Sequence, residues 1–532
     1  MSDRVPAVGA AQVEDVPWRV APVVAAAAFM EVLDISIANV SLQHIAGDLA
    51  ASQDESTWVL TSYLVTNAIV LPIAGWLASV VGRKRFFMMC IAGFTVSSLL
   101  CGMAPTLGTL ILFRAIQGLT GGGLQPLAQA IMADTFPPRQ RGMAFALYGM
   151  SVVFAPAIGP ALGGWITDEA SWRWVFLLNV PVGIVLVGLI NAIVHEPESL
   201  IAARAEKLAR GLRIDYLGFG LLSLGFGALQ VVLDKGQELD WFASSFIFWL
   251  SVVSVVSLVA FVLWELDHDD PIVEVHLLFD RNFGVASLLM FVLGFMLLGS
   301  TVLLPVMVQT LLGYTATLAG LVLTPGGFLI MAVMPLIGRL AATVDARYLI
   351  TAGLLLSAFA LLLMTHFDTQ VDFTTLLWAR VYQALGLSLL FIPINTAAFQ
   401  GIPIQKSAQA ASIINVARNI GGSFGISIVV TELSRQAQNH QTVLAGHTTP
   451  LDHAYRTTLF ALERMFAIAG DAPHAAQRAA AEIYRLLGQQ ATMQAFIDDY
   501  RLLAVIFVLL IPFVYLMRPA TLQTRGDGPA AH

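Results

Sequence analysis

Three ionisable side chains stand in stretches of sequence that are otherwise apolar enough to cross a membrane. Glu31 and Asp34 lie three residues apart in the segment 18–41, and Arg114 lies in the middle of the segment 107–131. Residues three apart share one face of a helix, so the two carboxyl groups are expected side by side. A charge in hydrocarbon costs about 2.5–3.5 kcal/mol on insertion scales unless it finds a partner or water. A carboxylate that alternates between Arg114 and a proton would convert a conformational change into a change of proton affinity.

The same three residues also have a purely structural interpretation. A fixed ion pair between Asp34 and Arg114 would tie two helices together without moving a proton. Two interpretations therefore stay open: proton coupling through Asp34, Glu31 and Arg114, or a static ion pair between Asp34 and Arg114.

A second group of polar side chains falls at intramembrane depth. Unpaired amides are costly in hydrocarbon, so these groups must face other helices or a water-filled cavity. Aromatic rings beside them would supply walls for a flat cationic or lipophilic ligand. The candidates for a substrate pocket are Asn39, Asn67, Gln117, Phe154, Gln309, Tyr382, Gln383 and Asn395. Interhelical hydrogen bonds are the alternative role for the amides.

Membrane-spanning helices must position all these groups. The chain has 532 residues, of which 57% are hydrophobic and only 12% charged, whereas a soluble globular protein has about 25% charged residues. The net charge of −7 leaves no basic surplus for binding nucleic acid. The two cysteines, Cys90 and Cys101, lie in one apolar stretch, which excludes a disulfide framework and a cysteine-based metal site. The class that fits is a polytopic, all-α membrane protein.

A spanning helix needs about 20 mostly apolar residues. That window predicts fourteen spans, near 18–41, 56–79, 86–104, 107–131, 142–166, 173–194, 216–235, 244–264, 284–309, 316–338, 348–365, 373–399, 408–431 and 500–517. With the N-terminus inside, seventeen Lys and Arg residues fall in short inner segments and only Arg173 and Lys235 in short outer ones. This bias predicts that both termini are cytoplasmic.

The chain contains a degenerate internal repeat. Arg114 and Gln117 recur as Arg380 and Gln383, 266 positions later, and Gly75 to Arg83 has an echo beginning at Gly338, 263 positions later. Spans 1–6 and 9–14 are therefore expected to be related halves, with two spans inserted between them. Repeated halves around a midplane site are the usual plan of secondary transporters.

Glycine, proline and basic residues mark candidate moving parts. The expected gating or structural residues are Gly75, Gly82, Arg83, Lys84, Gly159, Pro160, Gly163, Gly164, Arg380 and Arg418. Pro160 interrupts a helix and the neighbouring glycines allow close packing, which suits a pivot in alternating access or simple tight packing. The Gly82-Arg83-Lys84-Arg85 cluster serves orientation, and it also suits a latch between helix ends.

Five segments, in order, resemble the major facilitator superfamily, and within it the fourteen-span drug:proton antiporters of the EmrB/QacA type. They are Leu33–Val40, Gly75–Arg85, Leu112–Gly118, Ala155–Gly164 and Ser412–Gly422. The resemblance covers essentially the whole chain. It implies a major facilitator fold of two six-helix halves plus two inserted helices, and a proton-coupled exporter of amphipathic or lipophilic drugs in the bacterial inner membrane. The pattern around Pro160 is associated in that family with antiporters, which favours export over uptake.

The sequence departs from the family pattern at two positions. Ser79 stands where an acidic residue is usual, which puts a gating ion pair at that position in question. Ala155 stands where the span-5 motif often begins with Gly, a mild change because both residues are small.

The expected organisation follows from the spans. It comprises a cytoplasmic tail 1–17, a six-helix bundle 18–194, a linker 195–215, two inserted helices 216–264, a second bundle 284–517 and a tail 518–532. Within the second bundle, the periplasmic loop 432–499 carries two stretches with helical spacing, around Tyr455–Phe466 and from Asp471 to Leu487, expected as a hairpin of two short helices. The resemblance implies that EmrB-like proteins work with a periplasmic membrane-fusion adaptor and a TolC-like outer-membrane channel, so this loop is either a docking surface or a self-packed lid.

Other functions fit less well. No GxxxxGK[ST] sequence is present, which excludes ATP-driven transport and leaves the proton gradient, without a cofactor, as energy source. His268-Asp-Asp270 has no further ligands nearby, so no metal site is expected. A membrane-embedded enzyme would need convergent catalytic groups at one depth, and the ten histidines lie in loops, tails or span edges. A dedicated exporter of one metabolite or siderophore, and a non-transporting receptor or scaffold, remain alternatives.

Overall fold

The computed structural model describes residues 15–209, 211, 215–268, 271–449, 451–468 and 472–518. Most of the two expected tails therefore lies outside the described residues, as do Arg210 and Arg213 of the expected linker, Asp270 and Asp471. Within these ranges the chain is almost entirely helical.

The first half of the chain contains nine helices within residues 15–193. They are α1 Asp15–Val40, α2 Leu42–Asp48, α3 Gln53–Val81, α4 Arg83–Gly102, α5 Leu107–Gly121, α6 Leu124–Thr135, α7 Pro138–Glu169, α8 Arg173–Leu177 and α9 Asn179–Ile193. Local sequence sets several of these boundaries. Ser52 and Glu55 form a reciprocal capping box at the start of α3, and Thr106 and Thr109 form one at the start of α5.

The remaining helices include the linker, the inserted pair and the second half. They are α10 Glu198–Ala209, α11 Tyr216–Lys235, α12 Ser245–Asp267, α13 Arg281–Thr310, α14 Ala316–Leu340, α15 Ala346–Met364, α16 Phe373–Ala398, α17 Ser407–His447, α18 His453–Ile468 and α19 Ala475–Val514. Short 3₁₀ turns cover Trp241–Ala243, Val275–Phe279, Ile404–Lys406 and Ala472–His474.

Twelve helical segments of the described chain are long and apolar enough to cross a membrane. Two expected spans have a different form. The segment 107–131 consists of α5 and α6, separated by Gly122 and Gly123, and the segment 500–517 is the end of the longer helix α19. The count of fourteen spans therefore stays a prediction.

The loop 432–499 also differs from the expected pair of short helices. The first expected helix exists as α18, but the second is continuous with the last span in α19. Residues 432–447 likewise extend α17 beyond its expected end. The described sequence of this extension contains no proline, so nothing stops the helix at the membrane boundary.

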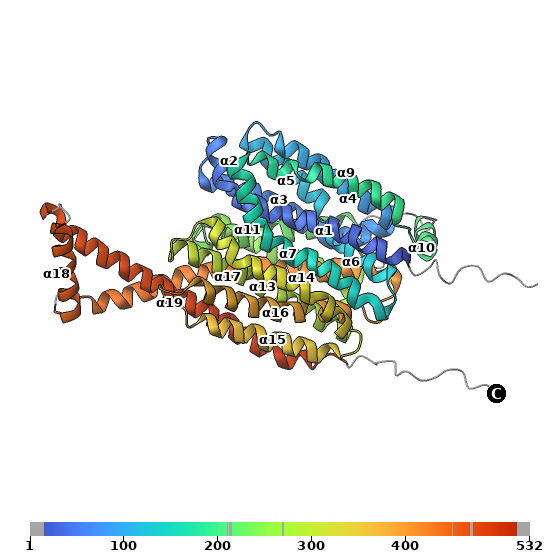
Figure 1. Ribbon diagram of the computed structural model, residues 1–532. Helices are drawn as coiled ribbons and strands as arrows, with labels where there is room; N and C mark the ends of the chain where they lie inside the picture. The colour runs from blue at the N-terminus through green and yellow to red at the C-terminus, as the bar shows by residue number, and fades with distance from the viewer. Residues whose placement is uncertain are drawn as a thin grey trace, which may run out of the picture.

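The bundle has two distinct ends. In Figure 1, α18 and the adjoining parts of α17 and α19 project from one end, here called the hairpin end. The opposite end carries α10 and the junction of α3 and α4, with Gly82 between them and Arg83–Arg85 at the start of α4, and is here called the basic end.

The two halves make the same contact twice at the basic end. A Cβ atom on Gly75 of α3 would lie 2.8 Å from the Ala408 carbonyl oxygen of α17. A Cβ atom on Gly338 of α14 would lie 2.9 Å from the Gly142 carbonyl oxygen of α7. Gly338 is the repeat of Gly75, and Ala408 follows Gly142 by 266 positions. The internal repeat is therefore also present in the packing.

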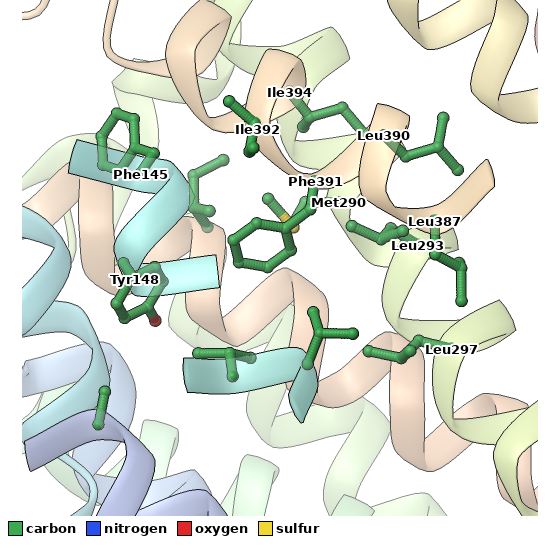
Figure 2. Packing of buried hydrophobic residues seen from close by; sticks show 14 of the residues in the cluster. Phe145, Tyr148, Met290, Leu293, Leu297, Leu387, Leu390, Phe391, Ile392 and Ile394 are labelled. Carbon is green, nitrogen blue, oxygen red and sulfur yellow. The ribbon is translucent and has the colours of Figure 1, made fainter. Parts of the chain in front are cut away.

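Apolar packing joins the halves in the middle of the bundle. Figure 2 shows Phe391 of α16 beside Tyr148 of α7 and close to Met290 of α13. The rings of Phe391 and Tyr148 are 6.0 Å apart, and a Cβ atom on Gly149 would lie 2.7 Å from the Phe391 ring. Because lipid is as apolar as these side chains, close packing rather than the hydrophobic effect stabilises this contact.

The inserted pair bridges the halves towards the hairpin end. Thr61 of α3 donates to Asp234 of α11. Lys235 of α11 donates to Thr57 of α3, and its ammonium group lies 5.6 Å from the Trp58 ring. From α17, Ser423 donates to Gln230 at 3.1 Å, so α11 is bonded to both halves. Most of α12, in contrast, is exposed on the outside of the bundle.

Candidate transport site

Asp34 lies at the centre of a fully buried polar cluster inside the first half. Its Oδ2 accepts from Arg114 Nη1 at 2.6 Å, and its Oδ1 accepts from Gln117 Nε2 at 3.1 Å and Asn179 Nδ2 at 2.7 Å. Ser98 Oγ accepts from the same two amides, at 2.7 and 3.1 Å. Helices α1, α4, α5 and α9 thus supply one closed network. The expected pairing of Asp34 with Arg114 is present.

The guanidinium group of Arg114 contacts several neighbouring groups besides Asp34. Its Nη1 also donates to Gln117 Oε1 at 2.7 Å, and its Nε donates to the Val59 carbonyl at 3.2 Å. The guanidinium carbon lies 4.4 Å from the Tyr63 ring centroid and 5.4 Å from that of Phe176. The side chain is 0% exposed. A buried guanidinium needs such a partner set, because a lone charge in this position is strongly disfavoured.

Glu31 is equally buried but less completely bonded. Its Oε1 accepts from Tyr63 Oη at 3.3 Å and from Asn67 Nδ2 at 3.1 Å, while Oε2 has no hydrogen-bond partner among the described residues. Gln125 of α6 and the charge of Arg418, from α17 in the second half, act on this carboxyl group, and Arg418 donates to Gln125. Glu31 therefore lies where the two halves meet, whereas Asp34 lies within one of them.

A chain of amides crosses the interface next to this carboxyl group. Gln129 of α6 donates to Asn395 of α16, and Asn415 of α17 donates to Gln129 at 2.5 Å. Tyr148 donates to Asn415 at 3.4 Å. Gln129 and Asn395 are 266 positions apart, so they occupy equivalent places in the two halves. Equivalent residues can touch in this way only near the axis that relates the halves.

Arg418 extends this polar layer towards Glu31. Its Nη2 donates to Gln125 of α6, and its exposed fraction is 7%. The sequence predicts a gating or structural role for Arg418 but not a position near a carboxyl group. Its position follows from the packing of α17 on α13, where the Arg418 carbonyl lies against Gly294.

The repeat of Arg114 has no carboxylate partner among the described residues. Arg380 Nη1 donates to Gln383 Oε1 at 2.6 Å, as Arg114 does to Gln117, but its Nη2 donates only to Thr301 at 3.4 Å. The Nε atom of Arg380 is buried without a described partner. The halves therefore share the Arg–Gln pair and differ in its carboxylate partner, which among the described residues Arg114 has and Arg380 lacks.

The structure brings five of the eight pocket candidates into the interior. Asn67, Gln117, Gln383 and Asn395 belong to the buried networks, and Phe154 is half-buried with its ring 6.4 Å from Phe29 and 5.5 Å from Phe328. The other three lie on the surface, namely Asn39 near the end of α1, Gln309 near the end of α13, and Tyr382 beside Trp378 on the outside of α16.

The turn between α3 and α4 holds the most constrained glycine of the basic end. Gly82 has φ +101°, and a Cβ atom there would lie 1.9 Å from Arg204 Nη1 of α10. Glu196 joins the turn to the linker by accepting from the Arg83 backbone N–H at 2.8 Å and from Arg204 at 3.0 Å. Lys84 donates to the Asn191 carbonyl at 2.7 Å, within the first half.

Arg83 links the two halves at this end. Its guanidinium forms an ion pair with Asp134 of α6 and donates through Nη2 to the Ile404 carbonyl of the second half at 2.6 Å. Ser407 at the start of α17 donates to the same carboxylate at 2.8 Å. Asp134 therefore supplies the carboxylate beside Arg83 at this end. Ser79 stands where the family pattern has an acidic residue, and its hydroxyl bonds only the Trp76 carbonyl among described partners. A gating role for the Arg83–Asp134 pair stays a prediction.

A cavity of about 220 Å³ lies beside this junction. It is lined by α3, α10, the linker before α13 and the start of α17, with Arg83, Glu196, Arg204, Glu274 and Gln409 among its walls. The cavity has both polar and apolar walls and lies at the basic end, beside Arg83.

The glycines of α7 fit against the helix that carries the carboxyl groups. A Cβ atom on Gly159 would lie 2.2 Å from Ser36 Oγ, and one on Gly163 would lie 2.9 Å from the Ile37 side chain. Gly164 has open space around it. Helix α7 continues through Pro160 without a break. Tight packing is therefore present at Gly159 and Gly163, and a pivot stays a prediction.

Sequence reasoning missed four residues that complete the site. Tyr63 donates to Glu31 and Asn179 donates to Asp34, Ser98 accepts from the amides of Gln117 and Asn179, and Asp134 binds Arg83. Asn179 and Asp134 carried a signal, because each is a polar residue beside or within an apolar segment. Tyr63 and Ser98 carried none, since hydroxyl groups are common in spanning helices.

The comparisons with known proteins agree with this architecture. Residues 24–426 match the Major Facilitator Superfamily. The chain belongs to the major facilitator superfamily. Its relatives include the fatty acid resistance protein FarB of Neisseria gonorrhoeae, 38% identical over 93% of this chain and 94% of that protein. They also include the multidrug export proteins EmrB of Haemophilus influenzae, 41% identical over 80% and 82%, and of Escherichia coli K12, 36% identical over 95% and 96%.

Solved structures support the major facilitator fold. The human organic anion transporter MFSD10 superposes with a TM-score of 0.59 at 13% identity, over 94% of this chain and 99% of that one. Identity at this level speaks for the fold alone. As a member of the superfamily, the protein is a multi-pass inner-membrane transporter of small organic molecules, and the EmrB-like resemblance of its motifs is confirmed.

Proposed function

We propose that the protein is a proton-coupled antiporter that exports amphipathic or lipophilic organic compounds by alternating access. The names of its relatives, which include fatty acid resistance and multidrug export proteins, support this class of substrate. Inward proton flow would supply about 2.3 kcal/mol per charge for each 100 mV of membrane potential.

The observation that carries the proposal is the position of Glu31. A carboxyl group with one unbonded oxygen, buried between two halves that must separate and rejoin, changes its surroundings in every transport cycle. An isolated carboxylate is costly in such a place, while its protonated form is not. Glu31 is therefore the exchanged proton's site, and the Asp34–Arg114 cluster holds α1 and α5 in the geometry that this exchange requires.

The contacts at the basic end support a latch. The ion pair of Arg83 with Asp134, together with the bonds to Ile404 and Ser407, joins the halves there. We assign this end to the cytoplasm, with both termini, from the distribution of basic residues. Opening towards the cytoplasm would then require these bonds to break.

The hairpin end supports a role in a tripartite pump. Helix α18 and the adjoining parts of α17 and α19 extend away from the bundle rather than folding over it (Figure 1). Apolar side chains such as Phe460, Met465 and Ile468 are exposed on α18. This shape favours docking of a periplasmic membrane-fusion adaptor, which would connect to a TolC-like outer-membrane channel, over a lid.

Reconstituted protein tests the transport activity. Proteoliposomes with an imposed pH gradient would be given a panel of lipophilic cations and long-chain fatty acids, with protein-free liposomes and an ionophore that collapses the gradient as controls. The proposal predicts gradient-driven flux of at least one class, lost with the ionophore. Flux that survives the ionophore would exclude proton coupling. No flux from the whole panel would exclude polyspecific export and favour a dedicated metabolite exporter or a non-transporting scaffold.

A further inference from the structure

Tyr63 contacts both charged parts of the site. Its phenol O–H donates to Glu31 Oε1 at 3.3 Å. The face of its ring lies under the Arg114 guanidinium, whose carbon is 4.4 Å from the ring centroid. The same guanidinium binds Asp34 at 2.6 Å. One rigid side chain therefore lies between the interface carboxyl group and the internal ion pair.

The surroundings fix Tyr63 in this position. The side chain is 0% exposed, and a Cβ atom on Gly121 of α5 would lie 2.9 Å from its phenol oxygen. Asn67 Nδ2, one turn further along α3, donates to that oxygen at 3.4 Å. Because Asn67 supplies a donor, the phenol O–H is left to donate to Glu31. Small residues on α5 and a neighbouring amide thus orient both ends of the ring.

Several charged or titratable groups face this unit. Glu31 and Asp34 from α1 and Arg114 from α5 act on Tyr63. Arg418 from α17 acts electrostatically on Glu31, and Glu31 acts on the thiol of Cys90 from α4. Any effect of pH on Tyr63 must pass through these groups.

The geometry makes the bonds of Tyr63 interdependent. A phenol that donates to a charged carboxylate becomes more electron-rich, since hydrogen bonds polarise one another at low dielectric. An electron-rich ring attracts a guanidinium more strongly through the cation–π interaction. Ionisation of Glu31 would thereby draw Arg114 towards the ring, in competition with Asp34, and protonation of Glu31 would return Arg114 to Asp34.

We propose that Tyr63 is a positioning residue that transmits the protonation state of Glu31 to the Arg114–Asp34 pair. The protonation of Glu31 then changes the strength of the Arg114–Asp34 pair, although Asp34 lies within the first half. This inference deepens the proposed antiport function and rests on it.

The substitution Tyr63→Phe separates the two contacts, because it keeps the ring under Arg114 and removes the bond to Glu31. The pH of half-maximal transport in proteoliposomes is expected to shift by about one unit, the equivalent of a tenfold change in proton affinity. The matched control is Tyr500→Phe, since Tyr500 is also 0% exposed and its hydroxyl donates to the Met307 sulfur at 3.8 Å.

A second measurement avoids transport altogether. The infrared band of protonated carboxyl groups, followed against pH in the purified protein, should show a shifted midpoint in Tyr63→Phe. In the Asp34→Asn background the shift should be smaller, because the coupled partner is gone. Overlapping pH curves for Tyr63→Phe and wild type, by both methods, would overturn the inference even if antiport is intact. A shifted infrared midpoint in a protein that moves no protons would keep the coupling and refute the proposed function.

Discussion

At the scale of single residues, the two halves offer an internal comparison of the same arginine. Arg114 and Arg380 each bond a glutamine three residues later, but only Arg114 bonds a carboxylate. Removing a cation from a buried ion pair leaves a buried charge without compensation. Removing Arg380 leaves a hydroxyl group and an amide, which are less costly to strand.

Arg114→Met is therefore expected to lower the free energy of unfolding by about 3–5 kcal/mol, and Arg380→Met by clearly less. Thermal unfolding in detergent measures both. Adding Asp34→Asn to Arg114→Met should restore much of the loss, because it removes the stranded charge. Equal losses in Arg114→Met and Arg380→Met would contradict a stabilising role for the pair.

Sequence reasoning identified the charged residues but not their neighbours. The pairing of Asp34 with Arg114 followed from the cost of isolated charges, yet Tyr63, Ser98 and Asn179 could not be assigned. Depth along a helix can be inferred from sequence, but the face that a side chain takes cannot when lipid and protein interior are equally apolar. For this reason the sequence did not predict that Asn39, Gln309 and Tyr382 lie on the surface.

At the scale of helices, the packing of α7 on α1 sets the position of both carboxyl groups. Gly159 and Gly164 provide a matched pair on one helix, since only Gly159 is crowded. Gly159→Ala is expected to destabilise the protein by about 1–3 kcal/mol through overpacking and to impair transport. Gly164→Ala should be neutral or slightly stabilising, because alanine favours helix. Thermal unfolding and proteoliposome flux measure the two effects, and an unaffected Gly159→Ala variant would be incompatible with this close fit.

The latch at the basic end predicts a change in accessibility. Asp134→Asn removes the charge that Arg83 pairs with and should shift the protein towards opening at that end. A cysteine at Gln409, which lines the cavity beside the latch, would be labelled by a polar maleimide faster in Asp134→Asn than in the otherwise unchanged protein. Both would carry Cys90→Ala and Cys101→Ala. A loss of about 1.4 kcal/mol corresponds to a tenfold increase in labelling rate. Unchanged labelling would show that Arg83 and Asp134 do not control access.

Helix boundaries were predictable where composition changes sharply and not where a helix continues past the membrane. The spans near 56–79 and 284–309 lie within the observed α3 and α13. The extension of α17 to residue 447 was not foreseen, since polar helix and polar loop have similar composition. The break between α5 and α6 was missed because Gly122 and Gly123 are apolar by composition.

At the scale of the whole molecule, the hairpin and the bundle are expected to be separable in function. Replacing His453–Ile468 with a Gly-Ser linker of the same length removes α18 and keeps both spans. Transport by the reconstituted protein should persist, whereas drug or fatty acid resistance in cells should fall to the level of a strain that lacks the protein. Full resistance in cells with this variant would argue against adaptor docking through α18.

The internal repeat accounts for the arrangement of the bundle and for its asymmetry. Paired contacts at Gly75 and Gly338 close the basic end in both halves, and Gln129 meets its equivalent Asn395 near the axis. Only the first half carries carboxyl groups in its first helix, where the second half has Leu297 and Ser300 at the positions 266 residues later. Proton exchange is therefore expected on one side of a nearly symmetric interface, at Glu31.

Substrate-induced proton release tests this assignment most directly. Proteoliposomes containing wild type, Glu31→Gln or Asp34→Asn would be loaded with a pH indicator and given a substrate that the wild type transports. Proton release is expected from the wild type and not from Glu31→Gln, while substrate binding to Glu31→Gln should still be measurable. Proton release by Glu31→Gln at the wild-type level would contradict the assignment and move the exchanged proton to Asp34.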